Sequence, residues 1–101
     1  MSRYYLTTAI DYVNSRPHLG TAYEKVTADV IARYKRLAGL DVHFLMGNDE
    51  HSQNVYKKAV EEGFHNKPVA YCDRMEEEFT AVWKALHCSY DDFIRTTQPR
   101  H

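Results

Sequence analysis

A short segment, residues 17–20, reads Pro-His-Leu-Gly and stands between an apolar run and a helical pattern. The apolar run, residues 4–10, predicts a buried strand. After the segment, apolar residues recur at spacings of 3, 4, 4 and 3, which predicts a helix over about 19–38; they are Tyr23, Val26, Val30, Tyr34 and Leu37. Gly39 is a suitable residue to end that helix. A histidine and a glycine therefore lie at a strand-to-helix junction, where open α/β sheets bind ligands.

The rest of the chain continues the alternation of strands and helices. Strands are predicted at 3–10, 42–46 and from about 91, and further helices at 50–62 and 69–87. The helix at 69–87 carries an apolar stripe with Trp83 beside it: Cys72, Met75, Phe79, Val82 and Leu86. We interpret residues 47–49 as a loop in which Asn48 or Asp49 caps the helix that follows.

This order predicts an α/β protein with a partial Rossmann-like nucleotide-binding fold, a parallel sheet with flanking helices. A parallel sheet needs both of its faces covered, and two or three strands make a thin one. We therefore expect residues 1–101 to be an incomplete part of one larger domain.

Composition narrows the functional classes. The 13 basic and 14 acidic residues give a net charge of −1, which argues against a general nucleic-acid binder. No apolar run approaches the length of a membrane span, and residues 1–3 lead into a strand without an apolar signal region, so we expect a cytoplasmic protein without a membrane partner. Cys72 and Cys88 are expected to be reduced, and two cysteines alone predict no zinc site in this segment.

His18 is the first candidate functional residue. The free N–H groups of a first helical turn attract phosphates, and a histidine there would bond to triphosphate oxygens and offset charge as pyrophosphate leaves. The alternative is a histidine that only caps the helix. For Gly20 two interpretations stay open: a backbone that a purine can approach, or a residue that relieves strain in a turn.

Asp49 follows one predicted strand, and Ile10 and Tyr12 lie at the end of another, so all three are expected at one edge of the sheet. The Asp49 carboxylate either caps a helix or pairs with a substrate ammonium. Ile10 and Tyr12 either pack in the core or form the wall of an apolar pocket beside that carboxylate. The functional interpretation requires His18 and Asp49 to face the same crevice.

Together these residues resemble the N-terminal part of the methionyl-tRNA synthetase family of class I aminoacyl-tRNA synthetases. The resemblance covers the whole chain and is carried by five segments in order: 4–14, 17–23, 28–34, 44–51 and 91–97. It implies that His18, Gly20 and Thr21 bind ATP, with His18 and Thr21 catalytic. It also implies that the methionine site is formed by Ala9, Ile10, Tyr12 and Asp49.

The reaction that this resemblance implies joins methionine to ATP, which enters with Mg²⁺. Methionyl-adenylate and pyrophosphate form first, and methionine then passes to tRNA held by regions outside this chain. Such catalysis depends on holding the reacting groups in line and stabilising the leaving charge.

Two departures from the family pattern bear on activity. Thr21 stands where the family usually has a second histidine, and it cannot carry positive charge. The family's Lys-Met-Ser-Lys-Ser loop, zinc-bearing insertion and anticodon-binding helices are absent, so the chain is expected to be the first part of a catalytic domain and weak or inactive alone.

Two alternatives remain at this stage. One is another nucleotidyltransferase with a His-x-Gly motif, acting on a substrate other than an amino acid. The other is a non-catalytic nucleotide-binding or interaction module that self-associates through an exposed sheet edge.

Overall fold

The computed structural model describes residues 2–65 and 67–101. Its elements, in chain order, are β1 (Arg3–Thr7), β2 (Asp11–Tyr12), α1 (Leu19–Leu37), β3 (Asp41–Asp49), α2 (Gln53–Glu61), α3 (Pro68–Ala85) and β4 (Asp92–Arg95).

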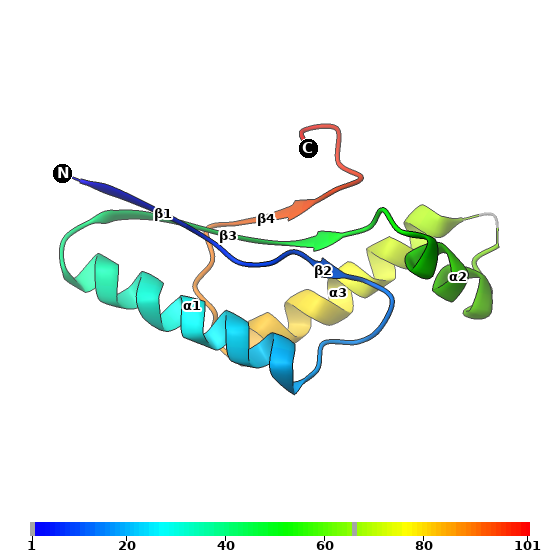
Figure 1. Cartoon of the computed structure of the whole chain (residues 1–101), viewed down its shortest axis with the longest axis horizontal. Coiled ribbons are helices and arrows are strands. Elements are labelled where there is room, and N and C mark those ends of the chain that lie inside the picture. Colours follow the sequence, from blue (N-terminus) through cyan, green and yellow to red (C-terminus); the bar gives the residue numbers. More distant parts are fainter. Residues whose placement is uncertain (1, 66) are drawn as a thin grey trace.

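Strand β3 organises the sheet. It pairs with β1 and β2 in succession and with β4, and every pairing is parallel. Figure 1 shows β3 within the sheet with the shorter strands β1, β2 and β4 beside it. This confirms the predicted α/β class with a parallel sheet.

The segment between β1 and β2 contains one residue more than the part of β3 that it faces. Thr7 is aligned with Leu45, whereas Asp11 is aligned with Asn48, so residues 8–10 stand opposite residues 46 and 47 only. Such an extra residue is a bulge, and it reverses which side chains point to each face of the sheet. Here it directs Asp11 to the same face as Asn48.

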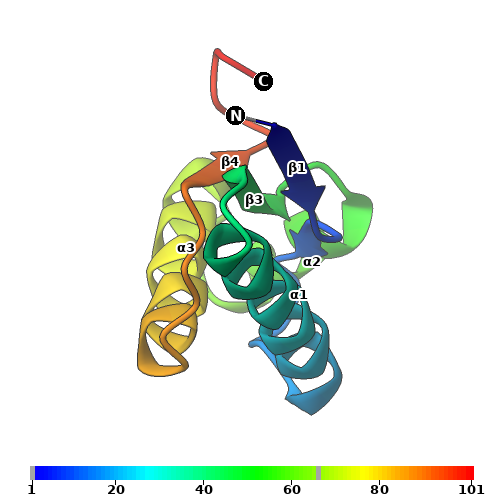
Figure 2. The same ribbon diagram turned by 90° about the vertical axis from the view of Figure 1, so that its left-hand side faces the viewer.

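Helices α1 and α3 lie on one face of the sheet, as Figures 1 and 2 show from two directions. The core forms on this face. Phe44 and Met46 of β3 meet Phe79 and Trp83 of α3, and all four are almost fully buried. Phe79 and Trp83 pack edge to face, with ring centroids 6.3 Å apart. On the opposite face the rings of Tyr5 and His43 stack on each other, and Tyr5 is 62 % exposed.

Two predicted strand boundaries and one predicted helix cap were wrong. The strand predicted at 42–46 extends from 41 to 49, so residues 47–49 belong to β3 and not to a loop. The strand predicted at 3–10 ends at Thr7, where the bulge begins. Neither Asn48 nor Asp49 caps α2; Ser52 does, since its hydroxyl accepts a hydrogen bond from the N–H of Val55 at 3.0 Å.

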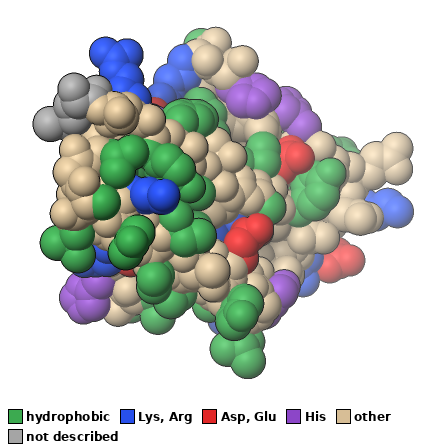
Figure 3. Space-filling view, turned by 60° about the vertical axis from the view of Figure 1, so that its left-hand side comes forward, with side chains coloured by type: hydrophobic (Ala, Val, Ile, Leu, Met, Phe, Trp, Pro, Cys, Tyr) green, Lys and Arg blue, Asp and Glu red, His purple; other side chains and the backbone are tan. Residues whose placement is uncertain are grey.

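The predicted helix at 19–38 is confirmed as α1, and Gly39 follows it with φ of +90°, a conformation that suits glycine. The apolar stripe that predicted this helix is largely exposed: Tyr23 is 76 % and Tyr34 66 % accessible. The buried side of α1 is instead small and charged, with Lys25, Ala28, Asp29 and Ala32. Figure 3 shows one face of the molecule, where apolar side chains lie at the surface among charged ones.

None of the helices within residues 2–65 and 67–101 is both long enough and apolar enough to cross a membrane.

Candidate active site

His18 is the N-cap of α1. Its Nδ1 accepts hydrogen bonds from the backbone N–H groups of Gly20 (3.1 Å) and Thr21 (3.3 Å), two of the donors that a helix start leaves free. With Nδ1 accepting, the proton of a neutral ring lies on Nε2, which is 3.1 Å from Thr21 Oγ1. The imidazole thus orders the helix start and remains exposed to solvent.

Gly20 lies in the first turn of α1, directly under the His18 ring. A Cβ at this position would stand 3.1 Å from His18 Cε1 and 3.2 Å from Nδ1, closer than ordinary contact. The missing side chain therefore lets the imidazole fold back over the helix start. This contact gives Gly20 a role that neither sequence interpretation had named.

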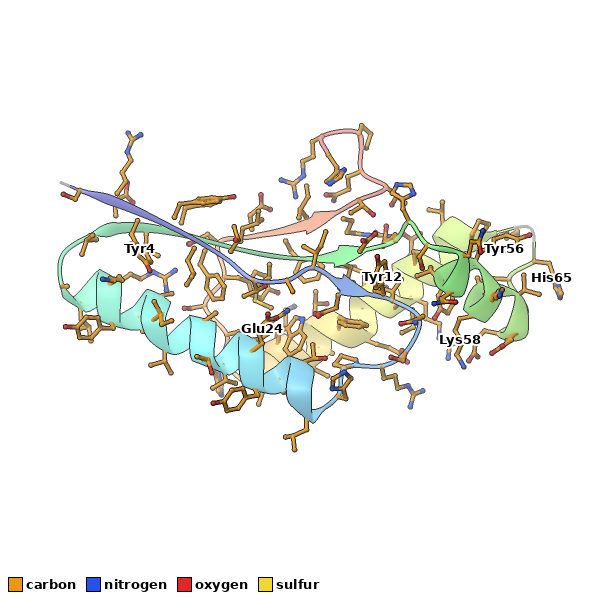
Figure 4. The ribbon with its side chains drawn as sticks, in the orientation of Figure 1. Tyr4, Tyr12, Glu24, Tyr56, Lys58 and His65 are labelled. Atoms are coloured by element: carbon orange, nitrogen blue, oxygen red, sulfur yellow. The ribbon has the colours of Figure 1, made fainter. Side chains whose placement is uncertain are left out.

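A cavity of about 190 Å³ brings His18 and Thr21 together with Asp11 and Tyr12. The remaining lining residues are Asn14, Ser15, Arg16 and Phe79. The sequence predicted three of the first four residues for this region and missed Asp11. Figure 4 labels Tyr12 at β2, the strand that leads into the loop before α1.

Asp49 does not line that cavity, but it is aligned with Tyr12 in the parallel pairing of β2 and β3. Aligned residues of parallel strands point to the same face of a sheet. Tyr12 thus neighbours both the His18 cavity and the Asp49 carboxylate. His18 and Asp49 lie at the same end of the sheet, but the cavity that His18 lines does not include Asp49, so this cavity is not the common crevice that the sequence led us to expect. Tyr12 lies between the two residues.

The Asp49 carboxylate is half-buried at the last residue of β3. Its Oδ1 accepts the backbone N–H of His51 at 3.0 Å, which fixes the direction of the side chain. An oriented carboxylate at the carboxyl end of a strand is suited to bind an ammonium group.

Ala9 and Ile10 form the bulge before β2. Ala9 lines a hollow of about 410 Å³ between the end of β1 and α1, together with Leu6 and Glu24. Ile10 approaches the centre of the sheet: a Cβ on Gly47 would stand 3.1 Å from Ile10 Cγ2.

A buried ion pair holds the chain just after Asp49. Glu50 Oε2 accepts a hydrogen bond from Arg95 Nε at 2.8 Å, and Arg95 also contacts Asp73 at 2.6 Å. Thr97 donates its hydroxyl to Glu50, and the hydroxyl of Thr96 accepts the Glu50 N–H at 2.8 Å. The segment after β4 therefore fastens the end of β3 and the carboxylate next to it.

Sequence reasoning also missed Lys25, which contacts Asp11 from α1. The sequence gives only a weak sign that Lys25 is buried. It lies on one side of the helix with Ala28, Asp29 and Ala32, and a row of small and charged residues does not predict a buried helix face. Burial raises the pKa of Asp11, and the Lys25 ammonium opposes that rise.

No group of three or more histidine, cysteine, aspartate or glutamate side chains is arranged to hold a metal ion within the described part of the chain.

A histidine-capped helix start at the carboxyl ends of parallel strands stands where open α/β sheets bind ligands, and helix starts attract anions. The chain belongs to the class I tRNA synthetases of the methionyl type, since the family model "tRNA synthetases class I (M)" matches residues 4–101.

Methionine–tRNA ligases are the relatives found by sequence. The Thermotoga maritima enzyme is 50 % identical over 99 residues, which cover 98 % of this chain and 15 % of that protein. The Rickettsia conorii enzyme is 51 % identical over 98 residues, covering 97 % of this chain and 19 % of that protein. This chain thus spans less than a fifth of the length of these relatives.

Among solved structures, Mycobacterium tuberculosis methionyl-tRNA synthetase in complex with methionyl-adenylate superposes with a TM-score of 0.95 at 46 % identity. The match covers all of this chain and 19 % of that one.

Proposed function

We propose that the protein is a methionine–tRNA ligase and that residues 1–101 form the first part of its catalytic domain. It activates methionine with ATP, taken as the magnesium complex, to methionyl-adenylate and pyrophosphate. It then transfers methionine to tRNA, which is held by regions outside these residues. The observation that carries the proposal is the likeness of this backbone, at 46 % identity, to an enzyme whose structure contains methionyl-adenylate.

ATP is assigned to the start of α1. The Nε2–H of His18 and the hydroxyl of Thr21 face one cavity, and Gly20 lets the imidazole lie against the helix start. These neutral donors, together with the positive end of the helix, favour phosphate oxygens. They stabilise the charge that grows on pyrophosphate as it leaves.

Methionine is assigned to the neighbouring strand ends. The Asp49 carboxylate, oriented by the His51 N–H, takes the α-ammonium group. Ala9, Ile10 and Tyr12 supply the wall for the apolar side chain. Tyr12 borders both regions, so the two assigned sites adjoin, as attack of the methionine carboxylate on the α-phosphate requires.

The test is methionine-dependent exchange of labelled pyrophosphate into ATP by the complete gene product. We expect exchange with methionine and little with other amino acids. Asp49→Asn should raise the KM for methionine and leave the KM for ATP nearly unchanged, because an amide cannot pair with the ammonium. Exchange with no amino acid would overturn the proposal. Heat on titration with choline phosphate, but not with methionine, would favour the other nucleotidyltransferases.

A further inference from the structure

Lys25 is a charged residue whose side chain is completely buried. Its Nζ donates to the carbonyl oxygen of Ala9 at 2.7 Å and to Glu24 Oε1 at 2.6 Å, and it lies 3.0 Å from Asp11 Oδ2. A lysine is almost never fully buried unless it is paired. Here two carboxylates and a carbonyl surround it, so the ammonium is fixed in place rather than free to move.

The partners of Lys25 lie on the bulge between β1 and β2. The bulge brings Asp11 to the face of the sheet that α1 covers, and a bulge leaves backbone groups without ladder partners. The Ala9 carbonyl is such a group; Lys25 and the Thr8 hydroxyl donate to it. Lys25 thus contacts Ala9 and Asp11, the two residues on either side of Ile10.

The same lysine is one helical turn beyond Thr21, in the helix whose first turn His18 caps. The far half of α1 is fastened separately, because Arg36 donates to the Ser89 carbonyl at 2.9 Å and to Asp91 at 3.1 Å. Within the described residues, the ion pair between Lys25 and Asp11 therefore joins the first half of α1 to the β1–β2 segment. Figure 4 labels Glu24, which completes this contact, between α1 and the strands.

We propose that Lys25 is a positioning residue for the methionine pocket: its ammonium group holds the bulge at residues 9–11 in the shape that places Ile10 and Tyr12 beside Asp49. The inference rests on the proposed function and deepens it, because it assigns the shape of the amino-acid site to a residue that touches neither methionine nor ATP. The selectivity between methionine and other apolar amino acids then depends on a charge buried under the sheet.

The experiment compares three variants of the complete gene product in the pyrophosphate exchange assay. Lys25→Met keeps an unbranched apolar stem of nearly the same length and removes the ammonium group. The double variant, Lys25→Met with Asp11→Asn, also removes the carboxylate that Lys25→Met leaves without a partner. If that unpaired charge is what destabilises Lys25→Met, the double variant regains stability. Lys35→Met is the matched control on the same helix, where the ammonium instead lies 5.0 Å from the centre of the Tyr4 ring.

We expect kcat/KM for methionine to fall by about ten- to a hundredfold in Lys25→Met, while the KM for ATP changes by less than about threefold. The preference for methionine over norleucine should fall as well. In the double variant the thermal midpoint should recover while kcat/KM for methionine does not, since the Ala9 carbonyl still lacks its ammonium donor. Recovery of both together would show a merely structural role and overturn the inference.

Amide hydrogen exchange adds a readout that needs no activity. Residues 10–12 should exchange about tenfold faster in Lys25→Met than in Lys35→Met or the parent protein. Equal exchange at these residues overturns the inference, even where methionine-dependent activity supports the proposed function. A parent protein that activates no amino acid overturns both.

Discussion

Gly47 lies where β3 passes closest to its neighbours, and replacing it with alanine tests the packing of the site. A Cβ there would stand 2.3 Å from the carbonyl oxygen of Ile94 and 2.6 Å from its Cγ2, with Ile10 Cγ2 at 3.1 Å. Ile94 is aligned with Gly47 in the sheet, so the nearest obstacle is backbone held in a ladder. It cannot give way as a flexible side chain would.

The cost follows from these distances. To restore ordinary contact, β4 must move by roughly 1 Å away from β3. Added methylene groups in a packed interior cost about 1–3 kcal/mol. Because the displaced strand leads to Arg95, which holds Glu50 beside Asp49, and because Ile10 is pushed from the other side, kcat/KM for methionine should fall about ten- to a hundredfold.

Two assays on the complete protein separate stability from activity. Cys72 is buried and burial raises the pKa of its thiol to about 11, so alkylation requires this segment to open. In Gly47→Ala its alkylation should accelerate roughly five- to 150-fold, which corresponds to about 1–3 kcal/mol. Gly63→Ala is the control, since its Cβ would meet nothing within 4 Å and only its φ of +88° is strained. An alanine variant with the parent's alkylation rate and kcat/KM would refute this reasoning.

Three further predictions test single contacts. His18→Asn keeps a residue that caps helices well but removes the imidazole, so kcat for exchange should fall about a hundredfold with little change in Cys72 alkylation; an active variant would contradict phosphate contact by His18. Asp29→Asn weakens the acceptor for the Ser89 N–H (2.7 Å) and should cost about 1–3 kcal/mol by chemical denaturation. Burial raises the pKa of Asp29, but hydrogen bonds from Ser89 and Arg33 outweigh burial, and the net pKa in the folded protein is lowered. The stabilisation by the Asp29 carboxylate is therefore complete above the pKa of the unfolded chain and should be lost as the pH falls through the pKa of the folded protein. A stability difference between parent and variant that stays constant down to about pH 2 would contradict this assignment. Glu50→Gln breaks the pair with Arg95 and should raise the KM for methionine more than that for ATP in steady-state exchange; equal changes would show that this pair does not hold Asp49.

Self-association through the sheet edge remains a prediction. Light scattering over a range of concentrations checks it, because an edge-paired assembly dissociates on dilution whereas a constant monomer mass would contradict it.

Periodicity was enough to predict most elements. The helix at 19–38 and the helix at 69–87 were each found within two residues of their predicted ends, because long periodic segments leave few alternatives. The parallel sheet followed from the alternation of strands and helices.

The site was predicted less completely because its geometry depends on contacts between distant residues. Gly47 and Asn48 read as a turn, yet they continue β3 because β4, about 45 residues further on, pairs with them. The bulge is visible only once β1 and β2 are both aligned with β3. Lys25 could not be recognised as buried, since its partners come from the strand segment that the bulge redirects.

The exposed stripe of α1 has a consequence for reading mutational data. Val30 is 60 % and Leu37 89 % accessible, so replacing either with glutamine or lysine removes almost no buried apolar area from the core formed by residues 1–101. Substitutions along the stripe should therefore leave the folding free energy of this segment nearly unchanged and improve its solubility. If the same substitutions lower activity in the complete gene product, the loss identifies a contact that this helix makes with a partner outside residues 1–101.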